Sequence, residues 1–507
     1  MTQKKTGLVD RFLNIVEKGG NALPHPVSLF AIFALMILVL SWVGWLLGWT
    51  VRHPGTNEDI AVINLLSKEG LDMIIVYMVH NFTSFVPLGI VLVALMGIGV
   101  AESSGLIGAL IRQMVISSPK KYLTFFIVLT GILSNMASDL GYVLLIPLAG
   151  VVYIAIGRHP IIGMAAAFAG VSGGFSANLF LGTIDPLVAG LSEEAAQIID
   201  PSYSVNPTAN YYFMVVSTFL IAFSGTWVTE KIIAPRYPEY KGKTEDTKIE
   251  RLSLLEKKGV KWAFVVFLIW LVILLVAVIP EKGILRGADG GLLSSPLIKG
   301  VIAILFLVAG TMGLVYGIIV KKFKNEADVY NGMADSLRSL ANYIVLVFFA
   351  AQFVAYFKWS NLGIIFAIEG ASMLSSMNIG VIPLMILFII LSAIINMFMG
   401  SASAKWAIMA PVFVPMFMLM GFSPELSQAV YRIGDSITNV ISPMMSFFAL
   451  IIAYFQVYDK KAGIGSIIST MIPYTFTFFI VWSALLVIWI LFGLPLGPGA
   501  GLYYSLP

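Results

Sequence analysis

The residues best placed to do chemistry are charged side chains inside long apolar stretches. There are five of them: Asp139, Asp185, Lys405, Arg432 and Asp435. An ionisable residue within a membrane costs roughly 2.5 to 3.5 kcal/mol on insertion scales, so each is a candidate for function. Arg432 and Asp435 are three residues apart, hence on one helical face, and can form a structural ion pair. Alternatively, Arg432 attracts an anionic ligand while Asp435 exchanges a proton or holds a cation.

Two further side chains each have two interpretations. Asp185, between Thr183 and Pro186, either takes part in the same chemistry or caps a helix near the outer surface. Trp406 either stacks on an aromatic ligand or anchors the chain at a membrane interface, the commoner role of Trp in membranes. The sequence leaves both questions open.

Oxygen-bearing side chains gather where the apolar stretches are interrupted. Such oxygens are the ligands that a hard cation prefers, and together they predict a sodium site, with close packing of small residues as the alternative. We expect no other cofactor. The residues of this predicted sodium site are Ser134, Asn135, Ser138, Ser403 and Asn439.

Several other chemistries lack the residues they need. The chain has no cysteine, which removes disulfides and thiolate sites. Gly242-Lys243-Thr244 ends like a phosphate-binding loop, but Tyr237 stands where its first glycine is required. The four histidines lie at predicted segment ends or in loops, without metal-ligand spacing. We therefore expect neither an enzyme nor an ATP-driven motor.

The elements that must position these residues are membrane helices. Of the 507 residues, 59% are hydrophobic and 11% charged, against roughly a quarter charged in a soluble domain. The apolar stretches approach the roughly 20 residues that cross a bilayer. The sequence therefore predicts an all-α polytopic membrane protein with about nine crossings. Four of the clearest stretches are 29–47, 263–279, 300–320 and 476–492.

The charge distribution predicts the orientation of these crossings. Basic residues mark the cytoplasmic side, and they gather at the N-terminus, at 112–121, 158, 231–261, 321–324 and 460–461. The stretch 192–210 has only acidic charges, and the tail after Leu494 has none. We predict a retained cytoplasmic N-terminal segment (1–27), a first half (28–230), a cytoplasmic linker (231–261), a second half (262–495) and an external tail (496–507).

Two apolar regions, 122–156 and 382–420, are cut near their middles by small and polar residues, at 134–139 and 400–406. Each is typical of a re-entrant helical hairpin with its polar tip in the membrane. The alternative is a surface loop between two short buried helices. Unpaired backbone at membrane depth is tolerated only where protein or a water-filled cavity meets it, so the hairpins imply a cavity.

The two halves repeat one pattern. Pro147, Pro160, Gly170 and Ser172 recur 264 residues later in the chain, as Pro411, Pro424, Gly434 and Ser436. After each hairpin comes a helix that is itself interrupted, at 173–178 and at 434–439. Since the charge pattern brings the two hairpins in from opposite sides, we predict inverted repeats, as in alternating-access transporters.

These motifs resemble the AbgT family of p-aminobenzoyl-glutamate transporters, and within it the MtrF-like antimetabolite efflux branch. The resemblance runs essentially end to end and is carried by four motifs, at 21–27, 170–186, 400–407 and 431–436. It implies a homodimer, a transport path in each protomer, and an elevator-type core beside a scaffold. Lys405 stands where we expect a neutral polar residue in relatives. The positions that the resemblance marks as functional are Asp185, Ser403, Trp406, Pro424, Arg432, Asp435 and Pro443.

The sequence thus predicts a secondary active transporter in a bacterial inner membrane. Its expected substrate is a small aromatic acidic solute related to folate synthesis, exported in exchange for protons, as in efflux of sulfonamide-type antimetabolites. The alternative is import of p-aminobenzoyl-glutamate driven by sodium or protons. Hairpins entering from opposite faces argue against an ion channel, and the charge in loops gives no support to nucleic-acid binding.

Overall fold

The protein is almost entirely helical, as the sequence predicts. The computed structural model describes residues 24–52, 57–137, 140–238, 240, 251–287, 290–292 and 295–505. Within these residues the strands are β1 (Thr50–Arg52) and β2 (Asp59–Ala61), which pair antiparallel with Val51 opposite Ile60. Most of the predicted N-terminal segment, part of the linker, Ser138 and Asp139 lie outside the described residues.

Nine helices within the described residues are long and apolar enough to cross a membrane. This number agrees with the expected nine crossings, but the helices that make it up are not all the expected ones. Two of the nine, α17 and α18, are the arms of the second predicted hairpin. The nine are Pro26–Leu46, Lys68–Ser103, Tyr211–Arg236, Leu254–Val278, Val301–Ile319, Ala341–Trp359, Val381–Phe398, Ala402–Leu419 and Ile464–Leu491.

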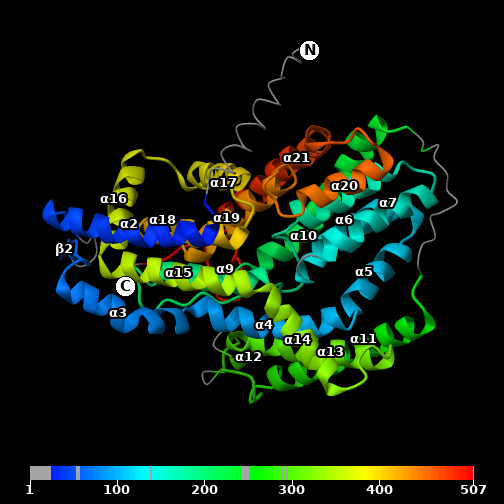
Figure 1. The fold of residues 1–507 in the computed structure, drawn as a ribbon, viewed down its shortest axis with the longest axis horizontal. Coiled ribbons are helices and arrows are strands. Elements are labelled where there is room, and N and C mark those ends of the chain that lie inside the picture. Colours follow the sequence, from blue (N-terminus) through cyan, green and yellow to red (C-terminus); the bar gives the residue numbers. More distant parts are fainter. Residues whose placement is uncertain are drawn as a thin grey trace, which may run out of the picture.

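One layer of helices packs around α4 (Figure 1). Small residues let its backbone approach its neighbours closely. A Cβ added at Gly97 would lie 2.5 Å from the Cα of Phe306 on α13, and one at Gly313 would lie 2.5 Å from the Cα of Ala101. The helices of this layer are α4 (Val86–Ser103), α5 (Leu106–Ile116), α11 (Leu254–Val278), α12 (Pro296–Lys299), α13 (Val301–Ile319) and α14 (Glu326–Ser339).

A second group lies at the end of the molecule that carries the small sheet (Figure 1). Its helix α15 packs on α2 and α3, and α16 contacts β1. A backbone hydrogen bond adds to this contact: the N–H of Ile63 donates to the carbonyl of Ser360 (3.0 Å). The helices of this group are α2 (Pro26–Leu46), α3 (Lys68–Thr83), α15 (Ala341–Trp359) and α16 (Leu362–Ser376).

The remaining helices form two copies of one unit. The first copy comprises α6 (Leu123–Ser134), a 3-10 turn (Asn135–Ala137), a π-helical turn (Gly141–Leu145), α7 (Ile146–Ala155), α8 (Pro160–Phe168), a second π-helical turn (Ala169–Gly173), α9 (Ile184–Ala196) and α10 (Tyr211–Val228), which continues through a further π-helical turn to Ile233. The second copy comprises α17 (Val381–Phe398), α18 (Ala402–Leu419), α19 (Pro424–Asn439), α20 (Phe448–Tyr458) and α21 (Ile464–Leu491).

Element boundaries recur between the copies at the same spacing of 264 residues that the sequence shows. The starts of α8 and α9, at Pro160 and Ile184, correspond in this way to the starts of α19 and α20, at Pro424 and Phe448. The turns before α8 and α19 contain Gly157 and Gly421, with φ of 79° and 86°. Such left-handed backbone favours glycine, so the turn explains why glycine stands at both positions.

Both predicted hairpin regions are built as helix, break and helix. In the first, α6 and α7 are separated by short turns and by the undescribed residues 138–139. In the second, α17 ends at Phe398 and α18 begins at Ala402. Two helices with a break between them fit both interpretations of these regions, so re-entry of the hairpins and their entry from opposite membrane faces stay predictions, and α17 and α18 are each long enough to cross a membrane.

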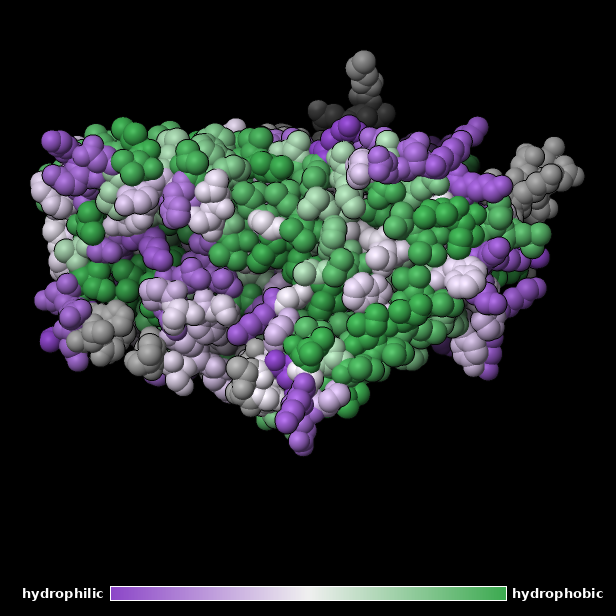
Figure 2. All heavy atoms as spheres, turned by 90° about the horizontal axis from the view of Figure 1, so that it is seen from below, coloured by the Kyte–Doolittle hydropathy of each residue, from purple (hydrophilic) through white to green (hydrophobic). Residues whose placement is uncertain are grey.

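The surface matches a membrane environment. Figure 2 shows apolar residues over much of one face of the molecule, with polar residues gathered mainly toward its two ends and along its lower edge. Exposed apolar side chains of α3 and α11, such as Ile75, Val79, Val272 and Val276, contribute to the apolar surface. A soluble protein rarely leaves so large a contiguous apolar area open to water.

Candidate functional site

Four buried charged side chains form two ion pairs. One pair joins the two copies, and the other lies within the second copy. Arg432 Nη2 lies 2.7 Å from Asp185 Oδ1, and the ammonium of Lys405 pairs with Asp435. The charged side chains of these pairs are at most 7% exposed. Of the two alternatives for Arg432 and Asp435, the mutual ion pair is therefore wrong, because each of the two pairs with an opposite charge on another helix.

Asp185 lies at the start of a helix, as one of its two interpretations expects, but it is buried rather than near the outer surface, and its part in chemistry stays a prediction. It lies in the first turn of α9, and its Oδ2 accepts a hydrogen bond from the backbone N–H of Gly182 (2.6 Å). A carboxylate at this position is stabilised by the positive end of the helix. Since its Oδ1 meets Arg432, the same side chain orders the loop before α9 and neutralises a buried cation.

Asn396 on α17 organises the second ion pair. Its Oδ1 accepts a hydrogen bond from Lys405, and its Nδ2 donates to the carbonyl of Asp435 (2.7 Å). The same nitrogen lies 2.9 Å from Thr438 Oγ1 and 2.8 Å from Asn439 Oδ1. Sequence reasoning missed Asn396, although an Asn inside an otherwise apolar helix was a signal that could have found it.

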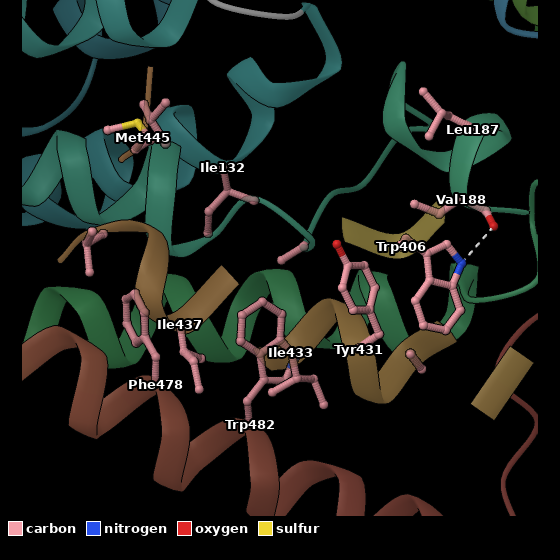
Figure 3. Close-up of a cluster of buried hydrophobic side chains, with 14 of the residues drawn as sticks. Ile132, Leu187, Val188, Trp406, Tyr431, Ile433, Ile437, Met445, Phe478 and Trp482 are labelled. Carbon is pink, nitrogen blue, oxygen red and sulfur yellow. Dashed lines mark hydrogen bonds between the residues drawn. The ribbon is translucent and has the colours of Figure 1, made fainter. Parts of the chain in front are cut away.

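Trp406 is fully buried, so it is not an interfacial anchor. Its ring stacks on Tyr431, with centroids 4.5 Å apart and planes inclined by 23°. Figure 3 shows the indole nitrogen directed at the carbonyl of Val188 (3.3 Å), and it also donates to Ser192 Oγ (2.9 Å). In this conformation Tyr431 covers one face of the ring, so a ligand can stack there only after Tyr431 moves.

A chain of buried polar groups continues from Trp406 through α9 and α19. Ser192 Oγ donates to Gln428 Oε1 (2.7 Å), and Gln428 Nε2 donates to Asn210 Oδ1 (2.8 Å). Asn210 Nδ2 then donates to the carbonyl of Glu425 (2.9 Å). Sequence reasoning missed this chain of hydrogen bonds, because Ser192, Asn210 and the pair Glu425 and Gln428 come from three separate segments and none forms a motif.

The interruption predicted at 173–178 is confirmed, because regular helix ends at Gly173, but the one predicted at 434–439 is wrong, because α19 is continuous from Pro424 to Asn439 and ends there. The backbone N–H of Ser176 donates to Ser436 Oγ (3.1 Å), which connects the break after the second π-helical turn of the first copy to α19. Pro424 is the first residue of α19, where its missing N–H is harmless. Pro443 lies in the turn between α19 and α20. The break in the first copy is thus in direct contact with α19 of the second copy.

The described residues of the predicted sodium site each contact a different group. Ser134 Oγ donates to the carbonyl of Gly131 (2.7 Å), and the side-chain oxygen of Asn135 is buried without a hydrogen-bond partner among the described residues. Asn439 is held by Asn396 on the Lys405 side of the site. Ser403 lies at the start of α18, its hydroxyl 3.2 Å from Ser401 Oγ, and Ser138 lies outside the described residues.

Comparison with known proteins identifies the family of this chain. The model of the AbgT family of transporters matches residues 11–504. The chain belongs to the AbgT family. Its members are transporters and not enzymes, and with nine apolar helices among its described residues, this AbgT chain is a multi-pass membrane protein.

Three relatives of this AbgT chain are similar over nearly their whole length. The p-aminobenzoyl-glutamate transport protein of Escherichia coli (strain K12) is 36% identical over 485 residues, covering 96% of this chain and 95% of the relative. The YdaH transporter of Alcanivorax borkumensis is 45% identical, with a TM-score of 0.88, covering 94% of this chain and 100% of that structure. Neisseria gonorrhoeae MtrF, described as one of a class of antimetabolite efflux pumps, is 50% identical, with a TM-score of 0.92, covering 97% and 100%.

Proposed function

We propose that this chain exports small aromatic acidic solutes related to folate synthesis, such as sulfonamide-type antimetabolites, in exchange for protons. The observation that carries the proposal is the pair Arg432–Asp185, which is buried next to the stacked rings of Trp406 and Tyr431. The similarity to MtrF supports export. Such a site offers one cation for an acidic group and one aromatic surface for a ring.

Arg432 provides the contact for the acidic group of the solute. A guanidinium binds a carboxylate or another planar anion through two parallel hydrogen bonds. In the conformation described, Asp185 occupies that position at 2.7 Å. A substrate anion therefore binds by taking the place of Asp185 on Arg432, and the site is closed to anions until this exchange occurs.

The same exchange couples the substrate to protons. Once its partner binds the substrate, Asp185 is a buried carboxylate without a counter-charge, and such a group takes up a proton rather than stay ionised. Among the described residues, the backbone N–H of Gly182 then remains as its hydrogen-bond donor. Substrate binding and protonation of Asp185 thus favour each other, so occupancy of the site by an acidic solute and the proton state of Asp185 are thermodynamically linked.

The aromatic part of the solute is placed by Trp406. Offset stacking of two rings contributes about 0.5 to 1.5 kcal/mol beyond burial, and Tyr431 supplies that stacking in the structure. An aryl ring of the substrate replaces Tyr431 on Trp406, while the hydrogen bonds to Ser192 and Val188 keep the indole in position.

The remaining expectations complete the proposal. The chain works as a homodimer in a bacterial inner membrane, with its N-terminus in the cytoplasm, and each protomer moves its core past the scaffold as an elevator. The two helix–break–helix units enter the membrane from opposite faces as hairpins. The repeat of element boundaries between the copies supports the inverted repeat, and the packing of α4 on α13 supports a separate scaffold.

A second candidate is a sodium- or proton-driven importer of p-aminobenzoyl-glutamate. The name of the Escherichia coli relative favours this substrate. A sodium ion would be held at the first break, where the buried side-chain oxygen of Asn135 lacks a hydrogen-bond partner among the described residues and Ser134 is its neighbour in the chain.

Uptake into everted membrane vesicles tests the first candidate. Vesicles containing the protein, and matched vesicles without it, receive labelled sulfonamide with and without an imposed proton gradient. We expect accumulation only with both the protein and the gradient. Equal equilibration in the presence and absence of the gradient would show a passive pathway and exclude proton exchange.

Counterflow separates the two candidates. Vesicles loaded with unlabelled p-aminobenzoyl-glutamate are diluted into the labelled compound at several sodium concentrations and constant ionic strength. A proton exchanger gives the same counterflow at each sodium concentration, whereas a sodium-driven importer gives counterflow that rises with sodium.

A further inference from the structure

Lys405 is the most completely buried cation of the site. Its side chain is 0% exposed, and its ammonium contacts the carboxylate of Asp435 and Oδ1 of Asn396. An ammonium has three donors and no acceptor, so it needs oxygen atoms around it. The oxygen atoms around Nζ therefore form a site that suits a small monovalent cation.

The orientation of Asn396 reinforces this assignment. Its Nδ2 is surrounded by three oxygens, the carbonyl of Asp435, Thr438 Oγ1 and Asn439 Oδ1, at 2.7 to 2.9 Å. These acceptors fix which end of the amide is nitrogen, and hence direct Oδ1 at the ammonium. An amide oxygen and a carboxylate oxygen held in place by the fold are ligands that a hard cation such as Na⁺ also uses.

We infer that Lys405 is a tethered cation that fills a sodium-type site formed by Asp435 and Asn396, and so makes the Asp435 half of this transporter independent of sodium. The inference deepens the proposed function, since it rests on proton rather than sodium coupling at this site. With the ammonium in place, a second cation beside Asp435 is excluded by charge and by volume. A shorter neutral residue at position 405 opens the same site to Na⁺.

The charged groups that face this site are balanced in pairs, so the site accommodates one cation only. Asp435 is balanced by Lys405, and Asp185 is balanced by Arg432, one helical turn before Asp435. The hydroxyl of Tyr431 donates to the carbonyl of Ala402. The four charges therefore sum to zero, and removing the ammonium leaves one buried negative charge that a sodium ion can neutralise.

The test measures sodium-specific stabilisation of the purified full chain, as the difference in Tm between NaCl and choline chloride at equal ionic strength. Lys405→Ser vacates the volume of the ammonium and supplies a hydroxyl, whereas Lys405→Met is also neutral but fills the volume. The double variant Lys405→Ser with Asp435→Asn removes the carboxylate. Lys258→Met, at an exposed position of α11, controls for loss of a lysine elsewhere.

We expect Na⁺ to raise the Tm of Lys405→Ser by several degrees more than that of the unmodified chain, because a cation that binds only the folded state stabilises it. The extra shift should be absent in Lys405→Met, in the double variant and in Lys258→Met. If Lys405→Ser does not fold, Lys405→Gln, which keeps a longer side chain and adds an amide oxygen, replaces it. Equal sodium shifts in the unmodified chain and in both of these variants would overturn the inference.

Transport distinguishes failure of this inference from failure of the proposed function. In vesicles with a proton gradient, sulfonamide flux through the unmodified chain should not depend on sodium, whereas flux through Lys405→Ser should require it. A sodium shift in Tm without any sulfonamide flux in either protein would keep the cation site and overturn the proposed substrate. Flux in both proteins, with no extra sodium shift and no sodium requirement in Lys405→Ser, would overturn only the cation site.

Discussion

The guanidinium of Arg432 on α19 lies 2.7 Å from the carboxylate of Asp185 on α9, and both side chains are buried. This ion pair joins the continuous helix α19 of the second copy to α9, the first helix after the break in the other copy. Breaking a buried pair by removing one partner costs about 3 to 5 kcal/mol, because an uncompensated charge stays behind. Any ligand that parts the two residues must supply a replacement for the lost partner.

Asp185→Asn should separate substrate binding from coupling. The variant keeps the size of the side chain but frees Arg432 from its internal competitor, so an acidic substrate should bind up to about tenfold more tightly, equivalent to about 1.4 kcal/mol. Proton-driven flux should be lost, since the amide does not exchange a proton. Binding is measured by displacement of labelled sulfonamide from the purified protein, and flux in everted vesicles.

Arg432→Met is the matched control for this experiment. It removes the anion contact, so binding of acidic solutes should fall by at least tenfold while a neutral aromatic analogue is affected less. Weaker binding in Asp185→Asn, together with unchanged proton-driven flux, would contradict the exchange of partners on Arg432.

The repeat could be predicted from sequence because proline and glycine are used at backbone positions that few other residues tolerate. Pro160 and Pro424 begin helices, and Gly157 and Gly421 have positive φ. These requirements belong to the local chain, so they leave the same spacing in the sequence as in the structure. The breaks in both helix–break–helix units were visible for the same reason.

The partners of the charged residues could not be predicted in this way. The spacing rule for helices considers only neighbours on one helix, and it paired Arg432 with Asp435. The structure instead brings Asp185 and Lys405 from α9 and α18. Which of several opposite charges meets a buried arginine depends on helix packing far away in sequence, as does the stacking of Trp406 on Tyr431.

Trp406→Phe tests the polar contacts of the buried indole. The variant keeps a ring beside Tyr431 but removes the donor to Ser192 and Val188. We expect a loss of about 1 to 3 kcal/mol in the free energy of unfolding, because buried acceptors lose a donor and some volume is left empty. Denaturation in detergent measures this loss. A variant as stable as the unmodified chain would show that the two hydrogen bonds carry no net stability.

Gly434→Ala tests how closely α19 packs on α17. An added Cβ would lie 2.5 Å from the carbonyl oxygen of Ile389 and 2.5 Å from Ser392 Cβ, so we expect destabilisation of about 1 to 3 kcal/mol. Gly89→Ala on α4 is the control. A Cβ there meets nothing within 4 Å, and alanine in place of glycine stabilises a helix by up to about 1 kcal/mol. Thermal unfolding of both variants should give shifts of opposite sign, and a Gly434→Ala as stable as Gly89→Ala would contradict the close packing.

His159, at the start of α8, should make the stability of the protein depend on pH. It caps α8, where its Nδ1 accepts a hydrogen bond from the backbone N–H of Ile161 (3.3 Å), and its ring packs against Tyr237. Burial lowers the pKa of His159, an effect that outweighs the opposing influence of Asp459. The unfolded chain, in which a histidine has a pKa of about 6.5, therefore binds a proton more readily than the folded chain does. Stability should fall as the pH decreases from about 7 through the lowered pKa.

Two substitutions separate the cap from the titration. His159→Asn keeps an acceptor for the helix N-terminus but does not titrate, so its stability should change less between about pH 7 and pH 5 than that of the unmodified chain. His159→Ala loses both functions and should be less stable than His159→Asn by about 0.5 to 2 kcal/mol at every pH. Thermal unfolding of the three proteins across this pH range measures both effects. If His159→Asn loses stability toward pH 5 as steeply as the unmodified chain, the titrating group lies elsewhere and His159 serves only as the cap of α8.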